Sequence, residues 1–223
     1  RASIRDEQAG QVLVAEAKSR GAKRIALLLE KTGWGYSNET SMRKAAKEHG
    51  IEIVAIEWLH WGASEVDKQL SALAETKPDA LMLVANAPEG IVVGKAWAEH
   101  SVLKNTPIIS HWGISSGSFA QGLGLDILNQ LDISIIQTFS FANAYDPDLA
   151  TKVLSLYREK YDEEATQNNI KGVVGLAQAY YLTMILAKAI EMVQSTDGNA
   201  IRNDSVKLAK HRGLVKKYDP PLN

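Results

Sequence analysis

The sequence predicts an α/β protein with a doubly wound parallel sheet in three α/β/α layers. Five short aliphatic runs alternate with amphipathic segments between residues 6 and 139 of the 223-residue chain. The run Ile25–Leu29 lacks the polar alternation of a half-exposed strand, so we expect a central strand that is covered on both faces. Strands that alternate with helices of about 10–15 residues form parallel βαβ units with right-handed crossovers.

The individual elements have their own start and stop signals. Gly21 and Gly50 end the first two helices, and Ser37 or Asn38 is expected to cap the second. Pro88 stands where a proline commonly begins a helix. The predicted strands cover 24–30, 51–58, 80–85, 107–110 and 133–139, and the predicted helices cover 6–20, 38–49, 65–76 and 88–100, with a short helix within 117–129.

The pattern changes after residue 140, where helices are predicted without a sheet to cover. Asp146-Pro147 starts one helix, and 173–193 forms a long helix rich in Ala and Leu. No strand is predicted in this region. Because the sequence also lacks an initiator Met, this imbalance leads us to expect that flanking sequence is missing.

Composition and charge argue against several functional classes. The formal net charge of -1 offers no basic field for nucleic acid or for an anionic membrane surface. The chain has no cysteine, and its five histidines show no His-x-x-x-His spacing, so neither a metal nor a cofactor is expected. No apolar run reaches the roughly 18 residues of a membrane span, so we expect no membrane insertion of this chain. Nucleophile-elbow and phosphate-loop motifs are absent from the sequence as well.

Three loops that follow predicted strands carry the candidate binding residues. They are Trp34-Gly35-Tyr36 after the first strand, Asn86-Ala87 after the third and His111-Trp112-Gly113 after the fourth. Ligands of open α/β sheets bind at the carboxyl ends of the strands, where these loops meet. The residues leave a structural alternative open, since the glycines can simply make turns and Asn86 can cap the following helix. Trp58, Trp61 and Trp97 are expected to be packing or rim residues.

The motifs, taken in order, resemble those of one protein family. They are RASIRDEQ at the start, KRIALLL followed by Trp34-Gly35, GASEVDKQLSAL before KPDALMLV, and then PIISHWG, QTFSFANAYDP and GLAQAYYLTMILAKAI. On these motifs the chain resembles the branched-chain amino-acid-binding (Leu/Ile/Val-type) family of periplasmic ABC-transporter substrate-binding proteins. The resemblance covers nearly the whole sequence. It implies the type I periplasmic-binding-protein fold, in which two α/β lobes joined by hinge strands close on a small ligand.

The resemblance also implies a division of the chain and a set of partners. Residues 21–138 would form most of the second lobe, while 1–20 and 139–223 would belong to the hinge and to an incomplete first lobe. The implied function is that of the extracytoplasmic solute-binding component of an ABC importer, periplasmic or extracellular, with a lipoprotein anchor left open. Its partners would be a small-molecule ligand and a membrane permease, and no catalysis is implied. A ligand-sensing extracellular domain of a signalling receptor and an enzyme on a doubly wound sheet remain alternatives.

Two residues depart from the family's pattern and bear on the ligand. Amino-acid binders of this family usually place a carboxylate in the third loop to hold the ligand ammonium, and Trp112 stands there in this chain. Asn86 stands where an aromatic residue is common. Because an indole N–H donates but cannot accept the protons of an ammonium group, we expect a ligand without one, such as an aromatic carboxylate, a short amide or another small organic acid. An amino-acid-like ligand stays an alternative, since the indole faces of Trp34 and Trp112 could still hold a cation.

Overall fold

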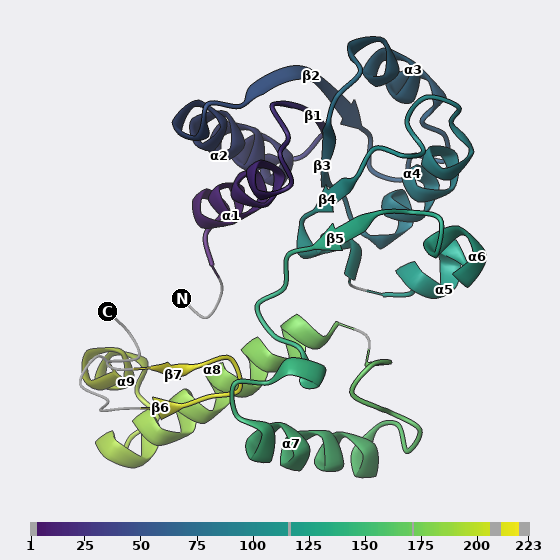
Figure 1. The fold of residues 1–223 in the computed structure, drawn as a ribbon. Helices are drawn as coiled ribbons and strands as arrows, with labels where there is room; N and C mark the ends of the chain where they lie inside the picture. The colour runs from purple at the N-terminus through teal and green to yellow at the C-terminus, as the bar shows by residue number, and fades with distance from the viewer. Residues whose placement is uncertain (1–3, 116, 171, 206–210, 219–223) are drawn as a thin grey trace. The chain divides into compact units, whose positions relative to one another are not determined.

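The chain forms two compact units in a computed structural model that describes residues 4–115, 117–170, 172–205 and 211–218 (Figure 1). One unit is Ile4–Gln137, and the other begins at Thr138. The first unit holds the entire parallel sheet, whereas the second is mainly helical.

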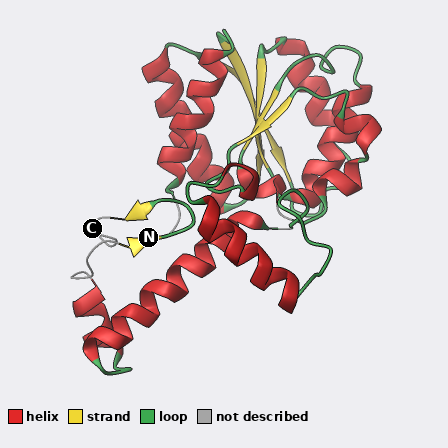
Figure 2. Cartoon of the chain, turned by 60° about the horizontal axis from the view of Figure 1, so that its bottom comes forward, coloured by secondary structure: helices red, strands yellow, loops and turns green. Residues whose placement is uncertain are grey.

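The Ile4–Gln137 unit is built on a five-stranded sheet in the order β2-β1-β3-β4-β5, and every neighbouring pair of strands is parallel. The strands are β1 (Arg24–Glu30), β2 (Glu52–Leu59), β3 (Ala80–Val84), β4 (Ile108–Ser110) and β5 (Ile133–Ile135). Helices lie on both sides of these strands in Figure 2. The predicted doubly wound α/β/α architecture is therefore confirmed.

Alternation of side chains along the strands decides which helices cover which face. The helices are α1 (Asp6–Ser19), α2 (Gly33–His49), α3 (Asp67–Thr76), α4 (Ala87–Glu99), α5 (Phe119–Leu123) and α6 (Leu125–Leu128). Ile25, Leu27 and Leu29 pack with α1 and α2 in one core. Ala26 and Leu28 face the opposite way and pack with α3, α4 and α5 in the other core.

Helix α2 begins earlier than its sequence predicts. Thr32, rather than Ser37 or Asn38, is the N-cap, and its hydroxyl oxygen accepts a hydrogen bond from the backbone N–H of Gly35 at 3.3 Å. Asn38 instead lies buried in the second turn of the helix, where its side-chain amide donates to the carbonyl of Trp34 at 3.0 Å. Trp34 therefore belongs to the first turn of a helix and not to the tip of a loop.

Helix α1, in the segment 1–20 that the resemblance assigns to the hinge and the first lobe, packs against the sheet of the Ile4–Gln137 unit. Leu13, Val14 and Ala17 of α1 are buried in the same core as Ile25 and Leu27 of β1. Burying these side chains keeps one apolar face of the sheet out of water. The observed position of α1 follows from that requirement.

The last strand of the sheet is shorter than predicted. The sequence predicts a seven-residue strand over 133–139, but β5 has three residues. It pairs only with β4, whose own three residues end at Ser110, opposite Ile135. An edge strand without a partner beyond that point has no ladder to continue, so the remaining apolar residues leave the sheet.

The second unit contains the two helices predicted for it and four elements that were not. Its elements are η2 (Phe141–Asn143), α7 (Pro147–Lys160), α8 (Val173–Val193), α9 (Gly198–Ser205), β6 (His211–Arg212) and β7 (Lys217–Tyr218). Asp146 caps α7 as predicted, since its carboxylate accepts a hydrogen bond from the backbone N–H of Leu149 at 3.2 Å. The antiparallel pair β6–β7 corrects the expectation of no strand here, because two-residue strands leave no periodic pattern in a sequence.

Helix α8 is apolar on almost every side. Within the described residues it is the one helix whose length and composition would suffice to cross a membrane, a test that core helices also pass. Its buried residues recur at helical spacing, as Val174, Ala177, Tyr181, Ile185 and Ala189. Leu182 and Leu186 on another side are half-exposed. The buried stripe is the pattern of a helix that packs on a protein core.

Candidate functional site

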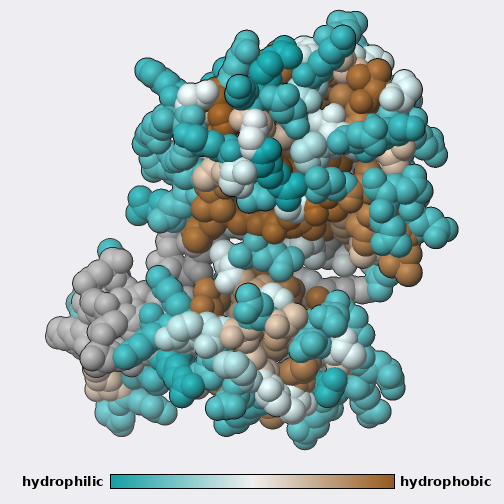
Figure 3. Space-filling model, in the orientation of Figure 1, coloured by the Kyte–Doolittle hydropathy of each residue, from teal (hydrophilic) through white to brown (hydrophobic). Residues whose placement is uncertain are grey.

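The candidate binding residues lie at one edge of the sheet in the Ile4–Gln137 unit. Strand β3 pairs with both β1 and β4, and all three run in the same direction, so their carboxyl ends lie side by side. The segments that follow these strands carry the three predicted groups of residues. Trp34, Gly35 and Tyr36 lie in the first turn of α2, Asn86 and Ala87 lie at the start of α4, and Trp112 and Gly113 belong to a short 3-10 helix, η1 (Trp112–Ser115), that follows His111. The surface of this unit is largely hydrophilic in Figure 3, with apolar residues gathered in a band along one edge.

Two tryptophans flank a histidine at this edge. The ring centroids of Trp34 and His111 are 4.8 Å apart with the planes nearly perpendicular, and those of His111 and Trp112 are 4.1 Å apart. Both indoles are half-buried, whereas His111 is 0% exposed. The structure therefore brings Trp34 and Trp112 together as accessible aromatic surfaces, and His111 packs behind them instead of reaching the surface.

The buried position of His111 determines its charge. Neither ring nitrogen has a hydrogen-bond partner among the described residues. Burial lowers the pKa of His111 to about 4, and the carboxylate of Asp6 opposes that shift only in part. At neutral pH the imidazole is uncharged, so it supports the two indoles through ring contacts alone.

Gly113 packs closely against residues that follow two other strands, Ala85 after β3 and Trp34 after β1. A Cβ atom at this position would lie 2.4 Å from the carbonyl oxygen of Ala85 and 2.6 Å from the ring of Trp34. No side chain larger than hydrogen fits between those two groups without movement of the backbone or the indole. The close approach of Gly113 thus fixes Trp34 against the loops that follow β3 and β4.

Asn86 is held by a buried carboxyl group that the sequence analysis did not select. Its side-chain Nδ2 donates to the two oxygens of Glu30 at 3.0 and 3.2 Å. Glu30 ends β1 and is only 1% exposed, while Asn86 is half-buried. Burial raises the pKa of Glu30, the hydrogen bond from Asn86 opposes that rise, and the nearby charge of Glu89 adds to it. The sequence did contain one sign of this buried carboxyl group, because Glu30 directly follows the aliphatic run Ile25–Leu29.

The other predicted site residues have different surroundings. Gly35 is buried beside β1, and Ala87 is 5% exposed, so neither offers much surface to a ligand. Tyr36 is 48% exposed and its ring lies 4.5 Å from that of Trp58. The Tyr36–Trp58 pair lies over β2 rather than in the Trp34–His111–Trp112 cluster.

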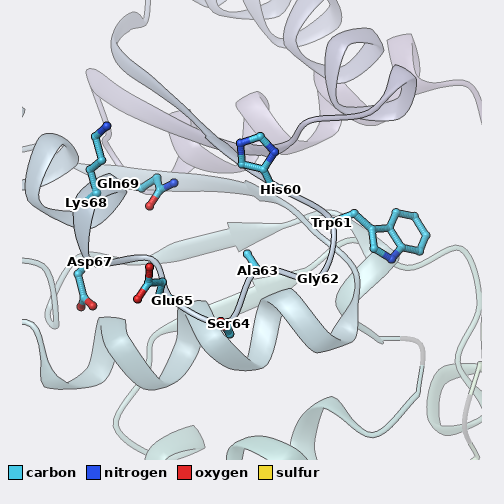
Figure 4. Close-up of a pocket in the computed structure, with 9 residues that line it drawn as sticks. All are labelled: His60, Trp61, Gly62, Ala63, Ser64, Glu65, Asp67, Lys68 and Gln69. Atoms are coloured by element: carbon cyan, nitrogen blue, oxygen red, sulfur yellow. The ribbon is translucent and has the colours of Figure 1, made fainter.

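The remaining tryptophans behave as packing or rim residues. Trp97 is fully buried, and its indole N–H donates to the carbonyl of Thr106 at 3.1 Å. Trp61 is 75% exposed on the loop between β2 and α3, and it points away from the other labelled side chains in Figure 4. That loop and the first turn of α3 line a hollow of about 550 Å³, and its polar groups include His60, Glu65 and Lys68. No group of His, Asp and Glu within the described residues has the arrangement of a metal site.

A sequence model described as "Periplasmic binding protein" matches residues 3–219 of the chain. No curated protein sequence matches this chain. Solved structures match over almost the whole chain at low sequence identity. The branched-chain amino acid transporter substrate-binding protein LivJ of Streptococcus pneumoniae, in complex with isoleucine, has a TM-score of 0.76 at 19% identity and covers 98% of this chain.

Two solute-binding proteins of ABC transporters from Rhodopseudomonas palustris share the same fold. The one in complex with benzoate has a TM-score of 0.80 at 15% identity and covers 98% of this chain. The one in complex with p-hydroxybenzoic acid has a TM-score of 0.81 at 17% identity and covers 99%. This chain spans 57% to 58% of the length of these three structures. The likeness establishes the type I periplasmic-binding-protein fold.

Proposed function

Because this chain belongs to the periplasmic binding protein family, we propose that it is part of the extracytoplasmic solute-binding component of an ABC importer. The observation that carries the proposal is the Trp34–His111–Trp112 cluster at the carboxyl edge of the sheet. In open α/β proteins this edge is where ligands bind. The edge would supply one wall of a ligand site that closes by hinge motion, and a membrane permease would then receive the ligand. Binding and release need no chemical step.

The aromatic wall favours a flat or apolar ligand. Trp34 and Trp112 are each half-buried, so each keeps part of its surface accessible. Indole groups stack on a ring and donate to a carboxylate or carbonyl oxygen, but they cannot accept the protons of an ammonium group. The proposed ligands are therefore aromatic carboxylates or short amides, a class that includes the benzoates bound by two proteins of similar fold.

Replacing either indole should weaken binding of such a ligand. We expect Trp34→Ala and Trp112→Ala each to cost about 1 kcal/mol or more in binding free energy, which is roughly a fivefold loss of affinity. Isothermal titration calorimetry of the intact protein with 4-hydroxybenzoate measures the loss directly.

A third tryptophan provides the matched control for this prediction. Trp61 is exposed outside the cluster, so Trp61→Ala should leave the affinity within about twofold of the wild type. If the wild type, Trp34→Ala and Trp112→Ala bind the ligand with equal affinity, the cluster is not part of the ligand site.

A further inference from the structure

Two polar side chains at the start of α4 do not cap that helix. Asn86 occupies the N-cap position of α4 and Glu89 follows three residues later, which is the spacing of a capping box. Asn86 makes no side-chain cap bond, and its amide donates to Glu30 instead. An oxygen of Glu89 accepts a hydrogen bond from the backbone N–H of Gly62 at 2.8 Å. Both side chains therefore turn from their own helix toward the ends of β1 and β2.

The contact with Glu30 fixes which end of the Asn86 amide is available. Nδ2 lies within 3.2 Å of both oxygens of a carboxyl group that is almost fully buried. When Glu30 is ionised its oxygens only accept hydrogen bonds, so the amide presents its N–H groups to Glu30, and a reversed amide would place oxygens against each other.

The opposite end of the amide remains accessible. Oδ1 of Asn86 accepts no hydrogen bond from the described residues, and it is not among the buried polar atoms that lack a partner. The side chain is half-buried beside the loop that carries the aromatic cluster. Among the polar atoms of Asn86, the carbonyl oxygen is the one that a ligand can reach.

We propose that Glu30 is a positioning residue that holds the Asn86 amide by its nitrogen, so that Asn86 offers the ligand a hydrogen-bond acceptor. The site would then select ligands that carry a neutral donor, such as a phenolic hydroxyl or an amide N–H, over analogues that lack one. This inference rests on the proposed function and narrows its ligand class. Glu30 itself does not touch the ligand.

The selection is tested with two acids that differ by a single hydroxyl group. Calorimetry of the intact protein should show 4-hydroxybenzoate binding about fivefold more tightly than benzoate, the usual effect of one neutral hydrogen bond. In Asn86→Ala the ratio of the affinity for 4-hydroxybenzoate to that for benzoate should be close to one. Glu30→Gln should also lower it, because a glutamine side chain can donate or accept and so no longer fixes the amide.

The ratio of affinities separates positioning from a purely structural role. Positioning predicts that Glu30→Gln leaves the affinity for benzoate within about twofold, since only the hydrogen bond to the hydroxyl is lost. An unchanged ratio in Glu30→Gln, or an equal loss of affinity for both acids, would overturn the proposal.

A ligand-free measurement distinguishes failure of this inference from failure of the proposed function. The NMR signals of the Asn86 side-chain amide should follow the titration of Glu30 in the wild type and should lose that dependence in Glu30→Gln. The amide of Asn38, which donates to the carbonyl of Trp34, is the internal control without a carboxylate partner. An Asn86 amide that does not titrate overturns the positioning role. If the Asn86 amide titrates but neither acid binds the wild type, the proposed function and the ligand selection are both wrong. The contact between Glu30 and Asn86 is then still supported.

Discussion

Substituting alanine for Gly35 should lower the free energy of unfolding by about 3 kcal/mol, the upper end of the range for an overpacked site. The added Cβ would lie 1.8 Å from the carbonyl oxygen of Glu30, a backbone atom that cannot turn aside as a side chain would. Relief of that contact requires the first turn of α2 to move off the end of β1. Urea unfolding of Gly35→Ala against the wild type measures the loss.

A neighbouring glycine in the same helical turn provides the control. A Cβ atom at Gly33 would meet nothing within 4 Å, so Gly33→Ala should be neutral or should stabilise the protein by up to about 1 kcal/mol. Because both substitutions have the same effect on the flexibility of the unfolded chain, the difference between them reports the contact with Glu30. Equal stability of the two variants would contradict the observed start of α2.

Acid should destabilise the folded protein through His111. Its pKa falls from the ordinary value of 6.5 to about 4 on burial, so between these values the unfolded chain binds a proton that the folded chain does not. Stability linked to this group is complete above pH 6.5 and is lost as the pH falls through about 4. The loss attributable to His111 should reach about 3 kcal/mol between neutral pH and about pH 4.

His111→Phe keeps an aromatic ring between the two indoles and removes the titrating group. Its free energy of unfolding should stay close to that of the wild type at neutral pH and exceed it by about 3 kcal/mol near pH 4. The raised pKa of Glu30 has the opposite effect, because it lowers the stability of the folded protein as the pH rises above 4.5. Glu30 is present in both proteins, so its contribution cancels from the difference. His60→Gln, at an exposed position, is the control. Parallel pH profiles for the wild type and His111→Phe would refute the buried, uncharged state of His111.

The fold was predictable from local sequence patterns, whereas several boundaries depended on tertiary contacts. Aliphatic runs such as Ile25–Leu29 are visible in the sequence alone, and the alternation with helices gave the parallel sheet. The start of α2 was misplaced because the packing of Gly35 on the carbonyl of Glu30 joins two elements, and no propensity records it. The end of β5 was misplaced because it depends on the length of its partner β4.

The candidate site was predictable at the level of loops but not of side chains. Loops after parallel strands meet at one edge in any such sheet, so Trp34, Asn86 and Trp112 could be grouped from the sequence. The direction of a side chain depends on the packing around it. For that reason the burial of His111 behind the indoles and the contact between Glu30 and Asn86 required the structure.

A ligand screen by thermal shift, followed by calorimetry on each hit, tests the central claim most directly. The intact protein would be screened against aromatic carboxylates, short amides and branched-chain amino acids. A true ligand at about 100 times its dissociation constant adds about 2.7 kcal/mol to the free energy of unfolding. We predict that an acid or amide without an ammonium group stabilises the protein and that leucine does not. Preferential stabilisation by leucine or valine, or no stabilisation by any of these compounds, would contradict the account.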